Sequence, residues 1–131
     1  MDCPHCKEPM IILELNEVEI DYCNDCNGIW LDAGELELLL DNTQEKEKLL
    51  SSFELASKTD EEKFRCPRCR KKMEKVNVGD EDQVLIDRCK YGHGLWFDKG
   101  ELPSIIEMGS REKDNKVIGL LKEMFADRKR D

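Results

Sequence analysis

The sequence has few aromatic residues and no long apolar run. Aromatic side chains make up 6% of its 131 residues, whereas charged side chains make up 39%. A single large hydrophobic core is therefore hard to build, and the fold needs another source of stability. No apolar stretch approaches the roughly 20 residues that cross a bilayer, and the first ten residues, MDCPHCKEPM, lack a signal-peptide pattern. We expect a cytoplasmic protein with no membrane segment.

Cysteine is the unusual component. The chain has seven cysteines, an odd number, and most of them stand in C-x2-C pairs. In a reducing compartment such pairs are typical of metal ligands rather than of disulfides. The sequence therefore indicates that metal binding supplies the missing stability.

The charge is negative overall and uneven along the chain. The formal net charge is −9; residues 1–63 carry 17 acidic and 5 basic residues (−12), whereas residues 64–131 carry 13 acidic and 16 basic ones (+3). A negative chain repels phosphate backbones on average. The positive second half leaves a local exception open.

A repeat organises the whole chain. GIWLDAGEL (28–36) returns as GLWFDKGEL (94–102), and the pair Cys3-Pro-His-Cys6 returns as Cys66-Pro-Arg-Cys69. The offset is 63 residues at the first pair and 66 from the second pair onward, so three extra residues fall near 79–82. Repetition at this scale predicts two copies of one small unit.

Each copy contains a hairpin pattern between its two metal-binding pairs. Apolar residues alternate with polar ones on both sides of a turn near Asn16 and Glu17, and copy two repeats this pattern around a glycine and acidic turn. Period-two alternation is typical of half-buried strands. The strand residues are Ile11, Leu13, Leu15, Val18, Ile20 and Tyr22 in copy one, and Val76, Val78, Val84 and Ile86 in copy two.

A helical pattern follows each second pair. Asp32 with Glu35, and Asp98 with Glu101, have the spacing of a helix N-cap and the acid that answers it. Residues 33–57 predict one long helix or two, and we favour a break near Asn42. Pro103 would remove a backbone hydrogen bond from the second helix and bend it.

The chain also predicts a last helix. Val117, Leu121, Met124 and Phe125 recur at helical spacing near the C-terminus. They predict an amphipathic helix followed by a basic tail.

Two metal sites follow from the cysteine spacing. Two C-x2-C pairs around a hairpin place four thiolates about 2.3 Å from a zinc ion. In copy two, His93 is the expected fourth ligand; the alternative is a three-cysteine site completed by water or Asp98. The expected ligands are Cys3, Cys6, Cys23 and Cys26 in site one, and Cys66, Cys69, Cys89 and His93 in site two.

Filled four-ligand sites favour a structural role for the metal. Catalytic zinc keeps one position open for water or substrate, so we expect no enzyme. Four thiolates can also hold iron in an electron carrier, a minor alternative. His5 lies between two ligands, and we expect its ring to point to solvent.

The combined pattern resembles the TFIIB-type zinc-finger domain family, the transcription-factor zinc ribbons. CPHC…CNDCNGIWLDAGEL and CPRC…CKYGHGLWFDKGEL carry this resemblance, with histidine displacing the last cysteine of copy two. It implies two tandem zinc ribbons with one zinc ion each, and it implies less about activity, since zinc ribbons generally serve as contact modules for proteins or nucleic acids.

The expected fold is thus a small zinc-stabilised α+β protein in four segments. Each ribbon is a β-hairpin that lies between two knuckles, the tight turns that carry the metal-binding pairs, and it is followed by a helix. The segments are ribbon 1 with four cysteine ligands (1–40), a helical linker (41–63), ribbon 2 with three cysteines and a histidine (64–108), and a C-terminal amphipathic helix with its basic tail (109–131).

The expected function is that of a protein-interaction adaptor. Apolar residues on the helices exceed what one buried face needs, which favours a protein partner or a homodimer, although the helices packing within the chain is an equal alternative. A nucleic-acid-binding or transcription-accessory role is the second hypothesis. It would use the basic residues around the second knuckle: Arg65, Arg68, Arg70, Lys71, Lys72 and Lys75.

The repeated nine-residue string is expected to close each ribbon. Gly28 and Gly94 would permit the tight backbone of the knuckle, and Trp30 and Trp96 would cover the hairpin. Gly34 and Gly100, at the expected helix starts, have no explanation in the sequence.

Overall fold

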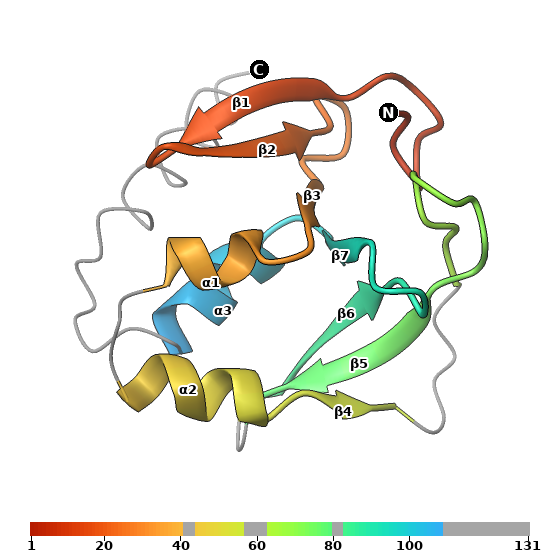
Figure 1. Cartoon of the computed structure of the whole chain (residues 1–131). Helices are drawn as coiled ribbons and strands as arrows, with labels where there is room; N and C mark the ends of the chain where they lie inside the picture. The colour runs from red at the N-terminus through yellow and green to blue at the C-terminus, as the bar shows by residue number, and fades with distance from the viewer. Residues whose placement is uncertain (41–43, 57–62, 80–82, 109–131) are drawn as a thin grey trace.

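One antiparallel sheet runs through both copies (Figure 1). The computed structural model describes residues 1–40, 44–56, 63–79 and 83–108. Within these residues the strand order is β1-β2-β3-β7-β6-β5-β4. The strands are β1 (Ile11–Leu15), β2 (Val18–Tyr22), β3 (Ile29–Asp32), β4 (Glu54–Leu55), β5 (Glu74–Val78), β6 (Val84–Arg88) and β7 (Gly94–Phe97). The helices are α1 (Glu35–Leu39), α2 (Gln44–Ser51) and α3 (Glu101–Met108).

Both predicted hairpins are present. β1 pairs with β2 from Ile11 opposite Tyr22 to Leu15 opposite Val18. Asn16 and Glu17 form the turn with φ of 51° and 68°, as a two-residue type I′ turn requires. β5 and β6 form the second hairpin, from Glu74 opposite Arg88 to Val78 opposite Val84, with a connection three residues longer than in the first.

The two hairpins meet through the repeated string. β3 pairs antiparallel with β7, and Trp30 lies opposite Trp96, its own counterpart. A residue that pairs with its counterpart lies on an approximate two-fold axis, so the two copies are related by a half turn about this pair. The strings that we expected to close each ribbon separately therefore also join the ribbons.

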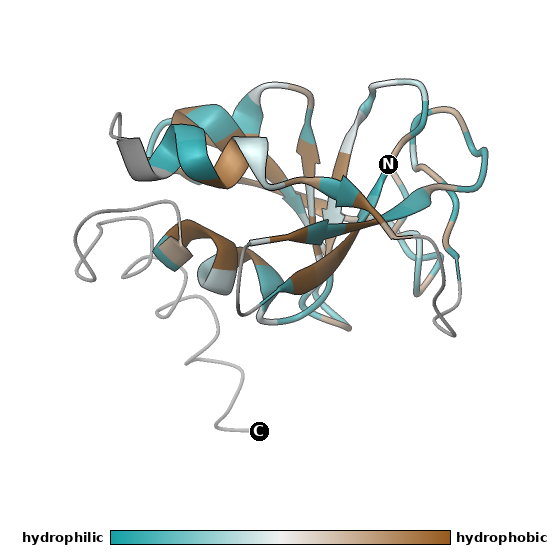
Figure 2. Ribbon diagram, turned by 90° about the horizontal axis from the view of Figure 1, so that it is seen from below, coloured by the Kyte–Doolittle hydropathy of each residue, from teal (hydrophilic) through white to brown (hydrophobic). Residues whose placement is uncertain are grey.

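The helices lie together at one side of the sheet (Figure 1), and α2 contacts α3. Figure 2 shows hydrophobic and hydrophilic residues interspersed along the helices and strands, and the buried ones of the helices include Leu36, Leu39 and Ile105. The predicted break is confirmed: α1 ends before Leu40, whose φ of −85° and ψ of 149° are extended, and α2 is a separate helix. Asn42 and the predicted C-terminal helix lie outside the described residues.

The expected helical linker is only partly helical. α2 is followed by the short strand β4, whose two residues pair with Val76 and Asn77 of β5. The outer edge of β5 offers unpaired backbone groups, and these favour an extended segment over a further helical turn. The extended geometry at Glu54 and Leu55 is thus set by partners 23 and 21 residues away in sequence.

The helix of copy two, α3, begins later than the sequence predicts. α3 starts at Glu101, so Pro103 is its third residue. The first four N–H groups of a helix have no partner within it, and proline there removes no hydrogen bond. The expected bend at Pro103 was therefore wrong.

Two groups of buried side chains fill the interior. The larger is mainly aliphatic and joins the sheet to the helices, including Ile20, Leu36, Ile86 and Ile105. The second contains both tryptophans, Met10, Met73 and four buried cysteines: Cys3, Cys23, Cys66 and Cys89. The metal-binding ends of the two ribbons thus share one core.

Candidate metal centres

The first donor set comes from the two turns that flank the first hairpin. Cys3, Cys6, Cys23 and Cys26 offer sulfur atoms that all lie within 4.8 Å of one another. Cys3 Sγ is 3.7 Å from Cys26 Sγ. A tetrahedron with Zn–S bonds of about 2.3 Å has S–S edges of about 3.8 Å. The donor set therefore fits zinc in both chemistry and size.

Backbone amides orient the sulfur atoms. Cys3 Sγ accepts hydrogen bonds from the N–H groups of His5 (3.3 Å) and Cys6 (3.2 Å). The turn that aims these amides places Lys7 at φ 66°, and the matching turn in copy two places Arg70 at the same angle. Both CPxC segments therefore form the same knuckle.

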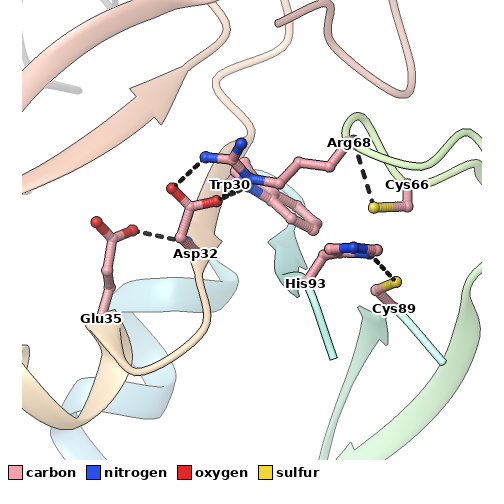
Figure 3. A network of polar contacts seen from close by, with 7 residues as sticks. All are labelled: Trp30, Asp32, Glu35, Cys66, Arg68, Cys89 and His93. Carbon is pink, nitrogen blue, oxygen red and sulfur yellow. Dashed lines mark hydrogen bonds and ion pairs between the residues drawn. The ribbon is translucent and has the colours of Figure 1, made fainter. Parts of the chain in front are cut away.

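The second donor set contains the displaced histidine. Cys66, Cys69, Cys89 and His93 offer donor atoms within 4.8 Å of one another. His93 Nδ1 is 3.2 Å from Cys89 Sγ (Figure 3), and Cys69 Sγ is 3.7 Å from Cys89 Sγ. The imidazole thus reaches the centre from one position beyond the counterpart of Cys26.

Asp98, the alternative fourth ligand, is engaged elsewhere. Its Oδ1 accepts a hydrogen bond from the Trp96 indole at 3.0 Å. The structure groups His93, and not Asp98, with the three cysteines. His93 is therefore the better candidate of the two.

Within each site burial makes some thiolates costly without a cation, whereas backbone N–H groups and neighbouring thiols lower the pKa values of Cys23, Cys69 and Cys89. Burial raises the pKa of the Cys3 thiol to about 11, although backbone N–H groups oppose this effect. Burial also raises the pKa of Cys66 to about 11. A divalent cation reverses this balance because it binds the thiolate form. Each site, once loaded with zinc, therefore replaces apolar core that the chain lacks.

The two tryptophans interlock the sites. Both indoles are fully buried. A Cβ placed on Gly28 would overlap the ring of Trp96, and a Cβ on Gly94 would overlap Leu31 O and crowd Trp30 Cζ2 at 2.7 Å. These glycines make room for the tryptophan of the other copy. They also close their own knuckles, as expected, because Gly28 O and Gly94 O accept the N–H groups of Cys23 and Cys89.

Each indole is held by the aspartate two residues later. Trp30 Nε1 donates to Asp32 Oδ1 at 2.9 Å, and Trp96 repeats this contact with Asp98. The Asp32 N–H donates in turn to Glu35 Oε1 at 2.6 Å (Figure 3). The prediction that Glu35 accepts a hydrogen bond from the Asp32 backbone is thus confirmed. The aspartate side chain, however, binds tryptophan instead of capping a helix.

A glycine precedes both α1 and α3. Gly34 precedes α1 with φ 89°, and Gly100 precedes α3 with φ 85°. This left-handed conformation favours glycine. It accounts for the two glycines that the sequence left unexplained.

An ion pair also joins ribbon 2 to ribbon 1. Arg68, on the knuckle that carries Cys66, reaches across to Asp32 (Figure 3), with Nη2 2.6 Å from Oδ2. The hydrogen bond from Arg68 holds the pKa of Asp32 below its usual value. No sequence signal separated Arg68 from the basic residues around it.

The predicted basic patch is therefore divided. Arg68 pairs with Asp32, and Lys75 lies buried with its Nζ 2.8 Å from Asp87 Oδ1. Lys71 lies over the Tyr91 ring at 4.7 Å. The side chains of Arg65, Arg70, Lys71 and Lys72 remain exposed.

His5, as expected, is exposed, and its ring also meets the edge of Phe64 at a centroid distance of 5.3 Å.

Comparison with known proteins identifies the same two regions. The family described as transcription factor zinc-finger, a zinc ribbon of the TFIIB type, matches residues 2–42 and 65–108. No curated protein and no solved structure shows a significant match. None of the described helices is long and apolar enough to span a membrane.

Proposed function

The chain belongs to the transcription factor zinc-finger family and carries two zinc ions, and from this premise we propose that it is a non-catalytic adaptor for a protein partner. The observation that supports this proposal most is that each site offers four protein donors. Catalytic zinc has three protein ligands and an open position. We place the adaptor in a reducing compartment, the cytoplasm, where seven thiols stay available for metal.

His93 completes the second site in this proposal. Zinc analysis of the full chain should give two ions, and X-ray absorption should report seven sulfur ligands and one nitrogen ligand over the two sites. The His93→Ala variant should lose the nitrogen ligand, while His5→Ala, the matched control, should not. An unchanged coordination shell in His93→Ala would remove His93 from the site and reopen the enzyme question.

The exposed residues of the helices limit the places where a partner can bind. Leu36, Leu39 and Leu40 are buried within the chain, and only Leu38 of that run is exposed, at 67%. Most of the helix run thus packs internally, which was the alternative that we left open. The other exposed large aliphatic residues of the described strands are Ile11, Ile12 and Leu55, which supports docking at the edges of the sheet.

Affinity capture from the native cell tests the adaptor function. An apolar interface should retain its protein partner between about 0.05 and 0.5 M salt, because salt screens charges and leaves apolar contact intact. Capture should fail when zinc is removed. A complex that survives zinc removal would contradict a zinc-stabilised binding surface.

Nucleic-acid binding is the second candidate. Arg65 and Arg70 from ribbon 2 and Lys7 from ribbon 1 line a cleft of about 330 Å³ between the two CPxC knuckles, and this supports contact with phosphates. Fluorescence anisotropy with DNA and RNA across a salt series tests it, since phosphate contacts weaken steeply with salt. Arg70→Gln should abolish such binding, and no binding at low salt would exclude this role.

A further inference from the structure

The two outer hairpin strands are counterparts in different surroundings. β1 and β5 are the first strands of their copies and lie at equivalent positions on either side of the β3–β7 pair. β5 is covered by β4, whose following residue, Ala56, donates its N–H to Lys75 O at 2.9 Å. The fold thus already accepts an extended segment on this edge of one ribbon.

The same edge of β1 ends the sheet. Met10 N–H donates outward to Met1 O at 2.9 Å, so the backbone groups of Ile12 and Glu14, two and four residues later, point the same way. The described residues form no hydrogen bond to that edge beyond Met10. Ile11 is 46% exposed and Ile12 is 67% exposed. An open apolar edge is a template for a further strand.

The two faces of β1 differ in chemistry. Ile12 and Glu14 share one face with their partners on β2, Asp21 and Glu19. In copy two the position of Ile12 holds Lys75, which pairs with Asp87, the counterpart of Asp21. Copy one therefore presents carboxylates around Ile12 where copy two has a cation.

The other face is apolar. Ile11 and Leu13 lie on it, opposite the buried Tyr22 and Ile20. An incoming strand alternates its side chains between the two faces. Basic residues would meet the carboxylates, and the apolar residues between them would extend the aliphatic core.

Together these observations define the partner chemistry. We propose that β1 is the docking edge for an extended segment of a partner protein in which basic and apolar residues alternate. It adds antiparallel to β1, as β4 adds to β5, and donates an N–H to Ile12 O. This inference rests on the proposed adaptor function and gives it a surface and a recognition rule.

A second copy of the chain fits this edge poorly. Residues 1–40 carry ten acidic residues and one basic residue, a formal charge of −9. Two such edges would face each other with like charges, which destabilises a strand pair. A basic segment gains from the same field.

The test uses the full-length zinc-loaded chain and a capped six-residue peptide that alternates lysine and valine. NMR should show slower amide exchange at Ile12 and Glu14 when the peptide is added, by roughly tenfold near saturation. The matched control peptide alternates glutamate and valine and should leave both exchange rates unchanged. Equal protection by both peptides, or by neither, would overturn the proposal.

Two variants test the geometry separately. Ile12→Pro removes an N–H that faces away from β2, a change that edge strands tolerate, and should abolish the protection at Glu14. Glu19→Lys, on β2, should weaken binding without touching the edge. Zinc content and amide shifts of β6 report that both variants fold.

The remaining outcomes are equally decisive. If the Ile12 and Glu14 amides are already as protected as those of β2 without peptide, the chain covers its own edge and the proposal fails. If Ile12→Pro still retains a salt-stable partner in affinity capture, the adaptor function stands and this docking edge falls.

Discussion

At the residue scale, glycine and tryptophan explain why the nine-residue string occurs twice. Each copy supplies a tryptophan and the gap for the tryptophan of the other copy. A change to the glycine therefore acts on the opposite ribbon. The two nine-residue strings therefore fit together as complementary shapes.

Gly28→Ala tests this reading. The added methyl group meets the Trp96 ring, and such overpacking costs about 1–3 kcal/mol. The variant should shift the Trp96 indole N–H resonance, because the ring must move relative to Asp98. Gly100→Ala is the control: it strains a positive φ, but nothing lies within 4 Å of its Cβ. If both variants left the indole resonance in place, the interlock would be disproved.

Arg68 offers a second test through the acids around it. Its hydrogen bond lowers the pKa of Asp32, and its charge opposes the raised pKa values of Asp21 and Glu35, which burial raises first. Arg68→Met should therefore raise all three. Carboxyl NMR titration should show this, with Asp21 and Glu35 responding at the higher pH.

The lowered pKa of Asp32 determines how its contribution to stability changes with pH. A carboxyl with a lowered pKa in the folded state adds stability above its unfolded value, about 3.9, and loses it as the pH falls below that value. The exposed pair should contribute about 0.2–1 kcal/mol at neutral pH. Arg88→Met, which breaks the Glu74 pair, is the control and should move none of the three acids.

At the element scale, the start of α3 decides what Pro103 does. Pro103→Ala should change the free energy of unfolding by no more than about 0.5 kcal/mol, because no hydrogen bond is missing in the first turn. If the helix began near Asp98, the same change would stabilise it by about 3 kcal/mol. Ile105→Ala, at a fully buried position, should cost about 2–5 kcal/mol in the same denaturant titration.

The elements also show what the sequence predicts and what it cannot. Alternation around Asn16 predicted the first hairpin, and the C-x2-C spacing predicted the cysteine clusters, because both signals are local. β4, the left-handed glycines before α1 and α3, and the β3–β7 pairing were missed. Each depends on a partner far along the chain or on a φ angle, and neither leaves a periodic pattern. Arg68 was likewise chosen by geometry from several similar cations.

At the scale of the whole molecule, we expect the two zinc sites to belong to one cooperative unit. They share a core with both tryptophans, the sheet is continuous between them, and Arg68 ties one knuckle to the other ribbon. A structural zinc site contributes an apparent ~10–16 kcal/mol. The net stability of a domain is only about 5–15 kcal/mol. Losing one ion should therefore unfold both ribbons.

The Cys69→Ser variant tests this coupling, because it impairs site two and leaves every residue of ribbon 1 unchanged. Amide exchange in β1 and β2 should accelerate as much as exchange in β5 and β6. His5→Ala, beside site one but outside the donor set, should leave exchange in both hairpins as it is. Protection that persists in β1 and β2 while β5 and β6 open would mean that the ribbons fold independently, and that the interlocked tryptophans only align two separate units.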